Sequence, residues 1–210
     1  MKTLFRVETP PQRREFVLRV SHEVGAEEHR GYVLFDDNDY PDYPILKWRK
    51  RALHLDLRCG VDEAGPEHIL KLMNSPDCDH FVWLSKRIAE SEPVHMVRVY
   101  AHELRHVIQG TLYSGLSKLT AELTVSLQKS PPEAPRTLYS IELPQELDAE
   151  LAAWQLVRSV FGDDEYVAYR SREIANNAKA ADYFRRFDEL ASSWRDDPIA
   201  ETRRLLLSRD

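Results

Sequence analysis

Hydrophobic and polar residues alternate with a period of two in three short stretches of the first 60 residues. These stretches are FVLRV (16–20), GYVLF (31–35) and ALHLDLR (52–58). Such alternation places successive side chains on opposite faces of a strand, and in the third stretch leucines alternate with His54 and Asp56. The first part of the chain is therefore predicted to form short strands, with the polar segment 36–44 as a loop.

After residue 60 the apolar residues recur every three or four positions, a spacing typical of amphipathic helices. Segment 80–90 is expected to form a further short element, and PPEAP (131–135) to form a loop. The helices are expected at 65–75, from about Ser91 (the candidate N-cap) onward, at 115–130, from Pro144 to about Phe161, from Asp163 to about Leu190, and near the C-terminal end.

Strands followed by helices predict an α+β fold, in which a small N-terminal β-sheet precedes a mainly helical part. With 210 residues, of which 42% are apolar, the chain is long enough to bury a sizeable core. We expect a single domain over 1–210, with a β-rich lobe at 1–60 and a helical lobe at 61–210.

The composition of the chain limits which binding partners and which cellular location are expected. A formal net charge of −6, with the basic residues scattered, argues against a nucleic-acid or anionic-membrane surface. The chain lacks a signal-type apolar segment and an 18-residue apolar span, so we expect a soluble protein. Cys59 and Cys78 show no CxxC spacing, which favours two reduced thiols in a cytoplasmic protein; an isolated disulfide is the alternative.

The stretch VYAHELRHVIQG (99–110) places two histidines and a carboxylate inside an apolar run. On a helix, His102 and His106 project from one face about one turn apart, which suits two imidazoles on a single Zn²⁺. Glu103 then has the general-base position of HExxH metalloproteases, next to a ligand without being one. The alternative is that both histidines bond locally on the helix; His95 is read as a surface histidine, and His80 is isolated in the sequence.

HELRH (102–106), followed 40 residues later by ELDAE (146–150), resembles the gluzincin-type zinc metallopeptidases, especially small bacterial ones. The resemblance covers about residues 91–160 and implies a zincin-like fold in which a small sheet precedes the active-site helix. It also implies that Glu146 is the third zinc ligand and that the acidic Glu150 orients a histidine ligand. The metzincin pattern is excluded, because Gln109 and Leu112 occupy its Gly and third His positions.

Helical phase alone leaves Glu150 open as the third ligand, because it lies one turn from Glu146 on the same side of the helix. Glu146 is preferred for three reasons. It follows Pro144 in the first turn without the Ser or Thr that a capping box would need at position 143; small residues follow it at 149 and 153; and Glu150 then keeps an outer role.

The resemblance implies hydrolysis of peptide bonds in a protein or peptide substrate, with Zn²⁺ as the cofactor. Two other functions share these residues: an inactive zincin-fold module that binds metal for regulation or interaction, and a metal-dependent amidase for a non-protein substrate. Tyr113 and Tyr139 are candidate oxyanion donors, and segment 129–140 could block or cover the cleft. The acidic segment 36–44 lacks the EF-hand spacing, so a solvated loop is expected there rather than a Ca²⁺ site.

Overall fold

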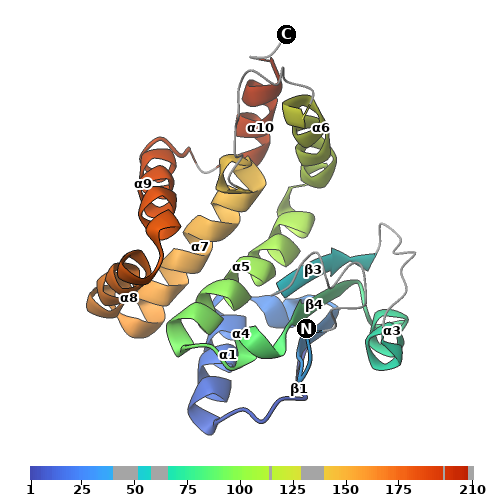
Figure 1. Ribbon diagram of the computed structural model, residues 1–210. Coiled ribbons are helices and arrows are strands. Elements are labelled where there is room, and N and C mark those ends of the chain that lie inside the picture. The colour runs from blue at the N-terminus through green and yellow to red at the C-terminus, as the bar shows by residue number, and fades with distance from the viewer. Residues whose placement is uncertain (40–51, 58–65, 114, 129–139, 196, 208–210) are drawn as a thin grey trace. The chain divides into compact units, whose positions relative to one another are not determined.

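The computed structural model describes residues 1–39, 52–57, 66–113, 115–128, 140–195 and 197–207. They form two compact units, Met1–Ile108 and Gln109–Asp210, and each is described by itself below. The first unit holds a small sheet and several helices, and the second is helical in its described part (Figure 1). The predicted α+β class is confirmed.

The described residues of the first unit form a four-stranded mixed sheet in the order β1-β2-β4-β3. β1 pairs with β2 and β2 with β4 in parallel, whereas β3 pairs with β4 antiparallel and lies at an edge of this sheet. The strands are β1 (Lys2–Phe5), β2 (Gly31–Phe35), β3 (Ala52–Asp56) and β4 (His80–Leu84).

The predicted strands at 31–35 and 52–58 are confirmed as β2 and β3, except that residue 58 lies outside the described residues. The short element expected at 80–90 consists of strand β4 and the short helix α4 (Lys86–Ala89). Every residue of β4 is buried. A strand covered on both faces has no polar alternation, which is why its sequence did not identify it as a strand.

The predicted strand at 16–20 is wrong, because these residues belong to helix α1 (Pro11–Glu23). Pro11 occupies the first helical turn, where its fixed φ and missing N–H are tolerated. Val17, Val20 and Ser21 are the buried residues of the helix, at the i, i+3, i+4 spacing of one helical face. A run of five residues is too short to distinguish this spacing from a period of two.

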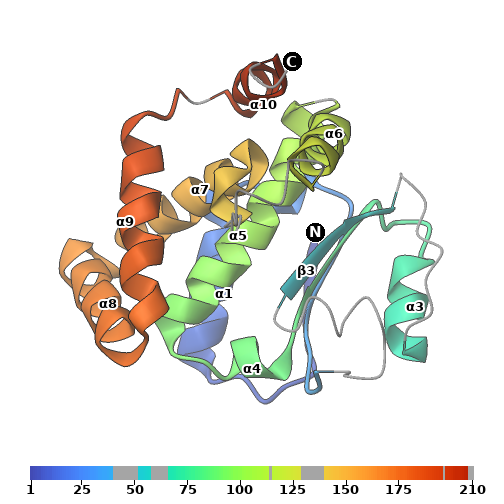
Figure 2. The same cartoon turned by 45° about the horizontal axis from the view of Figure 1, so that its top comes forward.

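Helices cover both faces of the sheet in the first unit (Figure 2). On one face, Ile69 of α3 (Glu67–Met73) packs in an apolar cluster with Leu53 and Trp83 of the strands. On the other face are α1 and α5 (Pro93–Leu112): the ring of Tyr100 lies 5.3 Å from that of Phe35, and its hydroxyl lies 2.6 Å from Ser21 Oγ. The sheet thereby fixes α5, the helix that carries HELRH. A 3₁₀ turn at Ala26–Glu28 precedes β2.

In the second unit, α7 packs against the other described helices. Trp154 of α7 lies against Tyr166, Tyr169 and Phe184, with ring centroids 5.1 to 5.9 Å apart. The elements are α6 (Leu116–Gln128), a 3₁₀ turn (Ser140–Glu142), α7 (Pro144–Phe161), α8 (Asp163–Asn176), α9 (Ala178–Ser192) and α10 (Pro198–Leu207).

The helix expected from Asp163 to about Leu190 is two helices, so that prediction is wrong. Asn177 separates α8 from α9 in an extended conformation (φ −146°, ψ 109°), and its side chain accepts a hydrogen bond from Lys179 N. An asparagine that bonds the backbone in this way caps a new helix N-terminus. The predicted helix Pro144 to Phe161 is confirmed.

The sequence predictions about membrane spans and about the two cysteines can be compared with the described residues. Among the described residues, no helix combines the length and the hydrophobicity that crossing a membrane requires. Cys78 is a free, buried thiol, and burial raises its pKa to about 11. Since the thiolate is the reactive form, this cysteine is expected to be inert at neutral pH. Cys59 lies outside the described residues.

Candidate metal centre

Helix α5 forms because its apolar residues recur at helical spacing. Val94, Val97, Ala101, Leu104 and Val107 are all buried, with exposed fractions of 3% or less. His102, Glu103 and His106 lie outside this stripe and are half-buried. The helix therefore buries one face and keeps His102, Glu103 and His106 at the margin of the buried region.

The two histidines of HELRH face each other. His106 Nε2 lies 3.1 Å from His102 Nε2, and the rings meet edge to face at a centroid distance of 4.8 Å. Two nitrogens that each lie about 2.0 to 2.1 Å from one zinc ion can be at most about 4.2 Å apart, so this separation fits a shared ion. A local hydrogen bond between two histidines has the same length, so a third residue is needed to indicate a metal.

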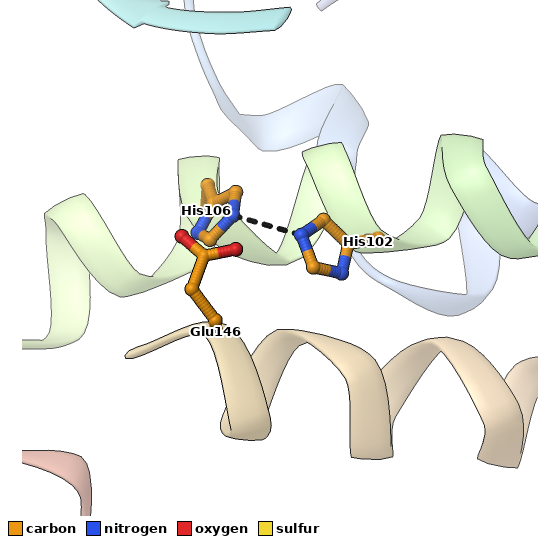
Figure 3. Close-up of side chains that lie close together, drawn as sticks. All are labelled: His102, His106 and Glu146. Atoms are coloured by element: carbon orange, nitrogen blue, oxygen red, sulfur yellow. Dashed lines mark hydrogen bonds between the residues drawn. The ribbon is translucent and has the colours of Figure 1, made fainter. Parts of the chain in front are cut away.

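Glu146 is that third residue. The ligand atoms of His102, His106 and Glu146 all lie within 4.8 Å of one another. Within the described part of the chain, no other group of three or more His, Cys, Asp or Glu side chains has this geometry. Figure 3 shows the Glu146 carboxylate directed toward the histidines. Two imidazoles and one carboxylate are a common donor set for catalytic zinc, so the residues present fit the ion.

Glu146 lies at the start of α7, where the chain has no residue suited to a capping box. Leu143 occupies the N-cap position in an extended conformation, and its side chain makes no capping hydrogen bond. Glu146 lies in the first turn, and its half-buried carboxylate belongs to the three-residue group. The sequence argument against a capping box is thereby confirmed.

Glu150 lies one turn after Glu146 and is almost completely buried. Its Oε1 accepts a hydrogen bond of 2.6 Å from the hydroxyl of Tyr183, on α9. Burying a carboxylate is costly unless it is hydrogen-bonded, so Tyr183 stabilises Glu150 at this position. The orientation of a histidine by Glu150 stays a prediction.

Sequence reasoning used Gln109 only to exclude the metzincin pattern, but this residue has a structural role. Within the second unit its side-chain amide donates to Gln145 O at 2.8 Å and to Asp148 Oδ2 at 2.7 Å. Gln109 and Asp148 are both buried. The last turn of α5 is therefore fixed to the residues that flank Glu146. The sequence feature that could have indicated this role is a polar residue, Gln109, in an apolar stretch one turn after His106.

His80, isolated in the sequence, has histidine neighbours in the fold. It is buried on β4, and its Nδ1 lies 3.2 Å from Nε2 of His54 on β3. The His54 ring in turn lies beside that of His106. Sequence reasoning missed this cluster because strand pairing joins His54 and His80, 26 positions apart, and the fold brings His106 of α5, 52 positions after His54, beside them.

Of the remaining candidates, His95 is not a member of the three-residue group. The role of Tyr113 as an oxyanion donor stays a prediction, and Tyr139 lies outside the described residues, as do residues 129–139. Residues 40–44 of the acidic segment also lie outside. Its first residue, Asp36, is not solvated as expected: it is buried and accepts a hydrogen bond of 3.1 Å from Trp83 Nε1, and burial raises its pKa.

Searches of protein-family models, curated proteins and solved structures find no match to this chain. The resemblance to gluzincins therefore rests on HELRH, on ELDAE and on the spacing between them. Any function must be argued from the chemistry of these residues.

Proposed function

We propose that this protein is a zinc-dependent metallopeptidase with a zincin-like fold, in which His102, His106 and Glu146 hold the ion. The observation that carries the proposal is the convergence of these three side chains, whose ligand atoms lie within 4.8 Å of one another. Chance spacing in a sequence does not by itself bring a distant carboxylate to a histidine pair. Glu146 comes from a helix that starts 38 residues after His106.

A zinc ion bound there would act as a Lewis acid that polarises the scissile carbonyl and lowers the pKa of a water molecule. Glu103 follows His102 directly and is not a member of the ligand group. Its carboxylate would accept the proton of the attacking water and deliver it to the nitrogen of the leaving amine. The water oxygen first forms a C–O bond to the carbonyl carbon, and the peptide C–N bond breaks once the nitrogen has received the proton, so no other reactant is needed.

The hydrogen bonds of Gln109 support this ligand set. They bind the end of α5 to the first turn of α7 through Gln145 and Asp148, on either side of Glu146. Ligands must be held closely in place for a metal site to form, and anchors of this kind supply that support. Ala149 and Ala153 of α7 are completely buried, and such small side chains allow a neighbouring helix to pack closely.

The position of strand β3 favours a peptide as the substrate in this proposal. It lies at an edge of the described sheet, on the side where His54 approaches His106. Edge strands offer unpaired backbone groups that an extended peptide can bind by adding a strand.

The proposal is tested by digesting an unbiased peptide library with the purified protein. The zinc-loaded protein is expected to cleave peptides, and the same preparation treated with a strong chelator is expected to cleave none until zinc is restored. Mass spectrometry of the products identifies the bonds broken. Cleavage that persists unchanged in the chelated protein would contradict a metal-dependent mechanism, and a zinc-loaded protein that cleaves no peptide would contradict the peptidase assignment.

A further inference from the structure

Two histidines outside the proposed ligand set lie on the sheet face opposite the apolar cluster. His54 on β3 pairs with Val82 of β4, and Asp56 pairs with His80. Directly paired residues of an antiparallel ladder point to the same face, so His54 and His80 share one face. Leu53 and Trp83 point to the other face, into the apolar cluster with α3.

The two imidazoles hold each other in place. His54 Nε2 lies 3.2 Å from His80 Nδ1, at hydrogen-bond distance, and the ring centroids are 5.4 Å apart. His80 is only 2% exposed, so it cannot move aside without breaking the packing around it. His29 lies edge-on against its ring at 6.0 Å. A buried ring on the central part of the sheet thereby fixes a half-buried ring on the edge strand.

The His54 ring is also nearly parallel to that of His106. The two planes differ by 19°, and the centroids lie 6.3 Å apart, within the range of interacting aromatic pairs. His106 meets His102 differently, at 86° and 4.8 Å. The ring of His106 is therefore in contact with His54 on one side and with the ring of the second proposed ligand on another.

Ring contact matters at this position because the outer torsion of a histidine side chain is soft. The χ2 angle of histidine has a broad, roughly two-fold distribution, so the helix backbone alone does not fix the plane of the ring. A neighbouring parallel ring restricts rotation about χ2, since turning His106 would drive its edge into His54. Groups that orient a metal ligand from outside typically contribute 10- to 100-fold to metal affinity.

We propose that His54 is a positioning residue that sets the ring plane of His106 for zinc, and that His80 acts through His54 by fixing it. This inference rests on the proposed function, since it assumes that His106 is a zinc ligand. It adds to the site two residues that come from the sheet, which the HExxH and Glu146 pattern does not contain.

The test is the zinc affinity of the full-length protein, measured by competition with a chromophoric chelator. His54→Ala is expected to weaken zinc binding about tenfold, at the lower end of the effect of outer partners. His54→Phe keeps a ring beside His106 but loses the bond to His80, so its affinity is expected to lie between those of the wild type and His54→Ala. The absorption spectrum of the cobalt-substituted protein is expected to change in His54→Ala, because the ligand field reports the orientation of His106.

A double-mutant cycle tests the role of His80. If His80 acts only through His54, His80→Ala weakens zinc binding by itself but adds nothing to His54→Ala in the double variant. Additive losses would overturn that part of the proposal. Thermal unfolding of the metal-free variants separates an effect on the site from an effect on the fold.

His22→Ala is the matched control, because this histidine is on α1 in the same unit and its side chain is 81% exposed. It is expected to leave both zinc affinity and the cobalt spectrum unchanged. Wild-type affinity and an unchanged spectrum in His54→Ala would overturn the inference while leaving the proposed function intact, as would an equal loss in His54→Phe. A wild-type protein that takes up no zinc would overturn both.

Discussion

Replacing Glu103 with glutamine is expected to leave zinc bound and to lower the rate of peptide hydrolysis about 100-fold or more. Glutamine has nearly the same shape as glutamate but accepts no proton at neutral pH, so general-base assistance is lost. Glu103 is not a member of the ligand group, so zinc affinity is expected to remain. The measurement is kcat/KM for a peptide found in the library digest, together with the zinc content of the same preparation.

Glu122→Gln is the matched control for this experiment. Glu122 is an exposed residue of α6, so the same chemical change is made on the protein surface. Its kcat/KM is expected to equal that of the wild type. If the Glu103→Gln variant cleaves the peptide as fast as the wild type, Glu103 is not the general base and the assigned mechanism is wrong.

Loss of Glu146 is expected to abolish zinc binding, whereas loss of Glu150 is expected only to weaken it. Glu146→Ala removes one of three protein ligands and leaves two histidines that must hold the ion alone. Glu150→Ala leaves all three in place and removes an outer group, for which a 10- to 100-fold loss of affinity is typical. Zinc affinity of the two variants, measured side by side, decides between them.

Folding must be followed in both variants, because Glu150 is buried and accepts a hydrogen bond from Tyr183. Glu150→Gln keeps the volume and an acceptor oxygen for that hydroxyl, so it tests the charge without opening a cavity. The reverse order of affinities, with Glu150→Ala losing zinc and Glu146→Ala keeping it, would transfer the third ligand to Glu150. That result would leave the roles proposed for His102, Glu103 and His106 unchanged.

The elements that could be predicted are those whose pattern is complete within a short window. β3 alternates leucine with polar residues, and α7 begins at a proline and keeps its apolar spacing to Phe161. Strand β4 is buried throughout, because α3 covers one face and the His80 face is also buried, so its sequence shows no alternation of apolar and polar residues. The break at Asn177 depends on a single side-chain bond to Lys179 N, which periodicity does not record.

The same distinction applies to the site. HELRH and the later glutamate are local patterns on two helices, so their spacing suggested the group that the structure brings within 4.8 Å. The supports are not local. Gln109 meets Asp148, Tyr183 meets Glu150, and His54 meets His80 through pairings between distant parts of the chain. Nothing in the neighbourhood of any one of these residues indicates its partner.

Metal content is the most direct measurement of the central claim. Protein purified without added metal and then reconstituted is expected to hold about one zinc per chain, and a strong chelator is expected to remove it and lower the melting temperature. An ion that binds only the folded state adds about 2.7 kcal/mol of stability when its free concentration is 100 times Kd. A reconstituted protein that holds no zinc, or whose melting temperature is the same with and without the ion, would contradict the assignment of His102, His106 and Glu146 as a zinc site.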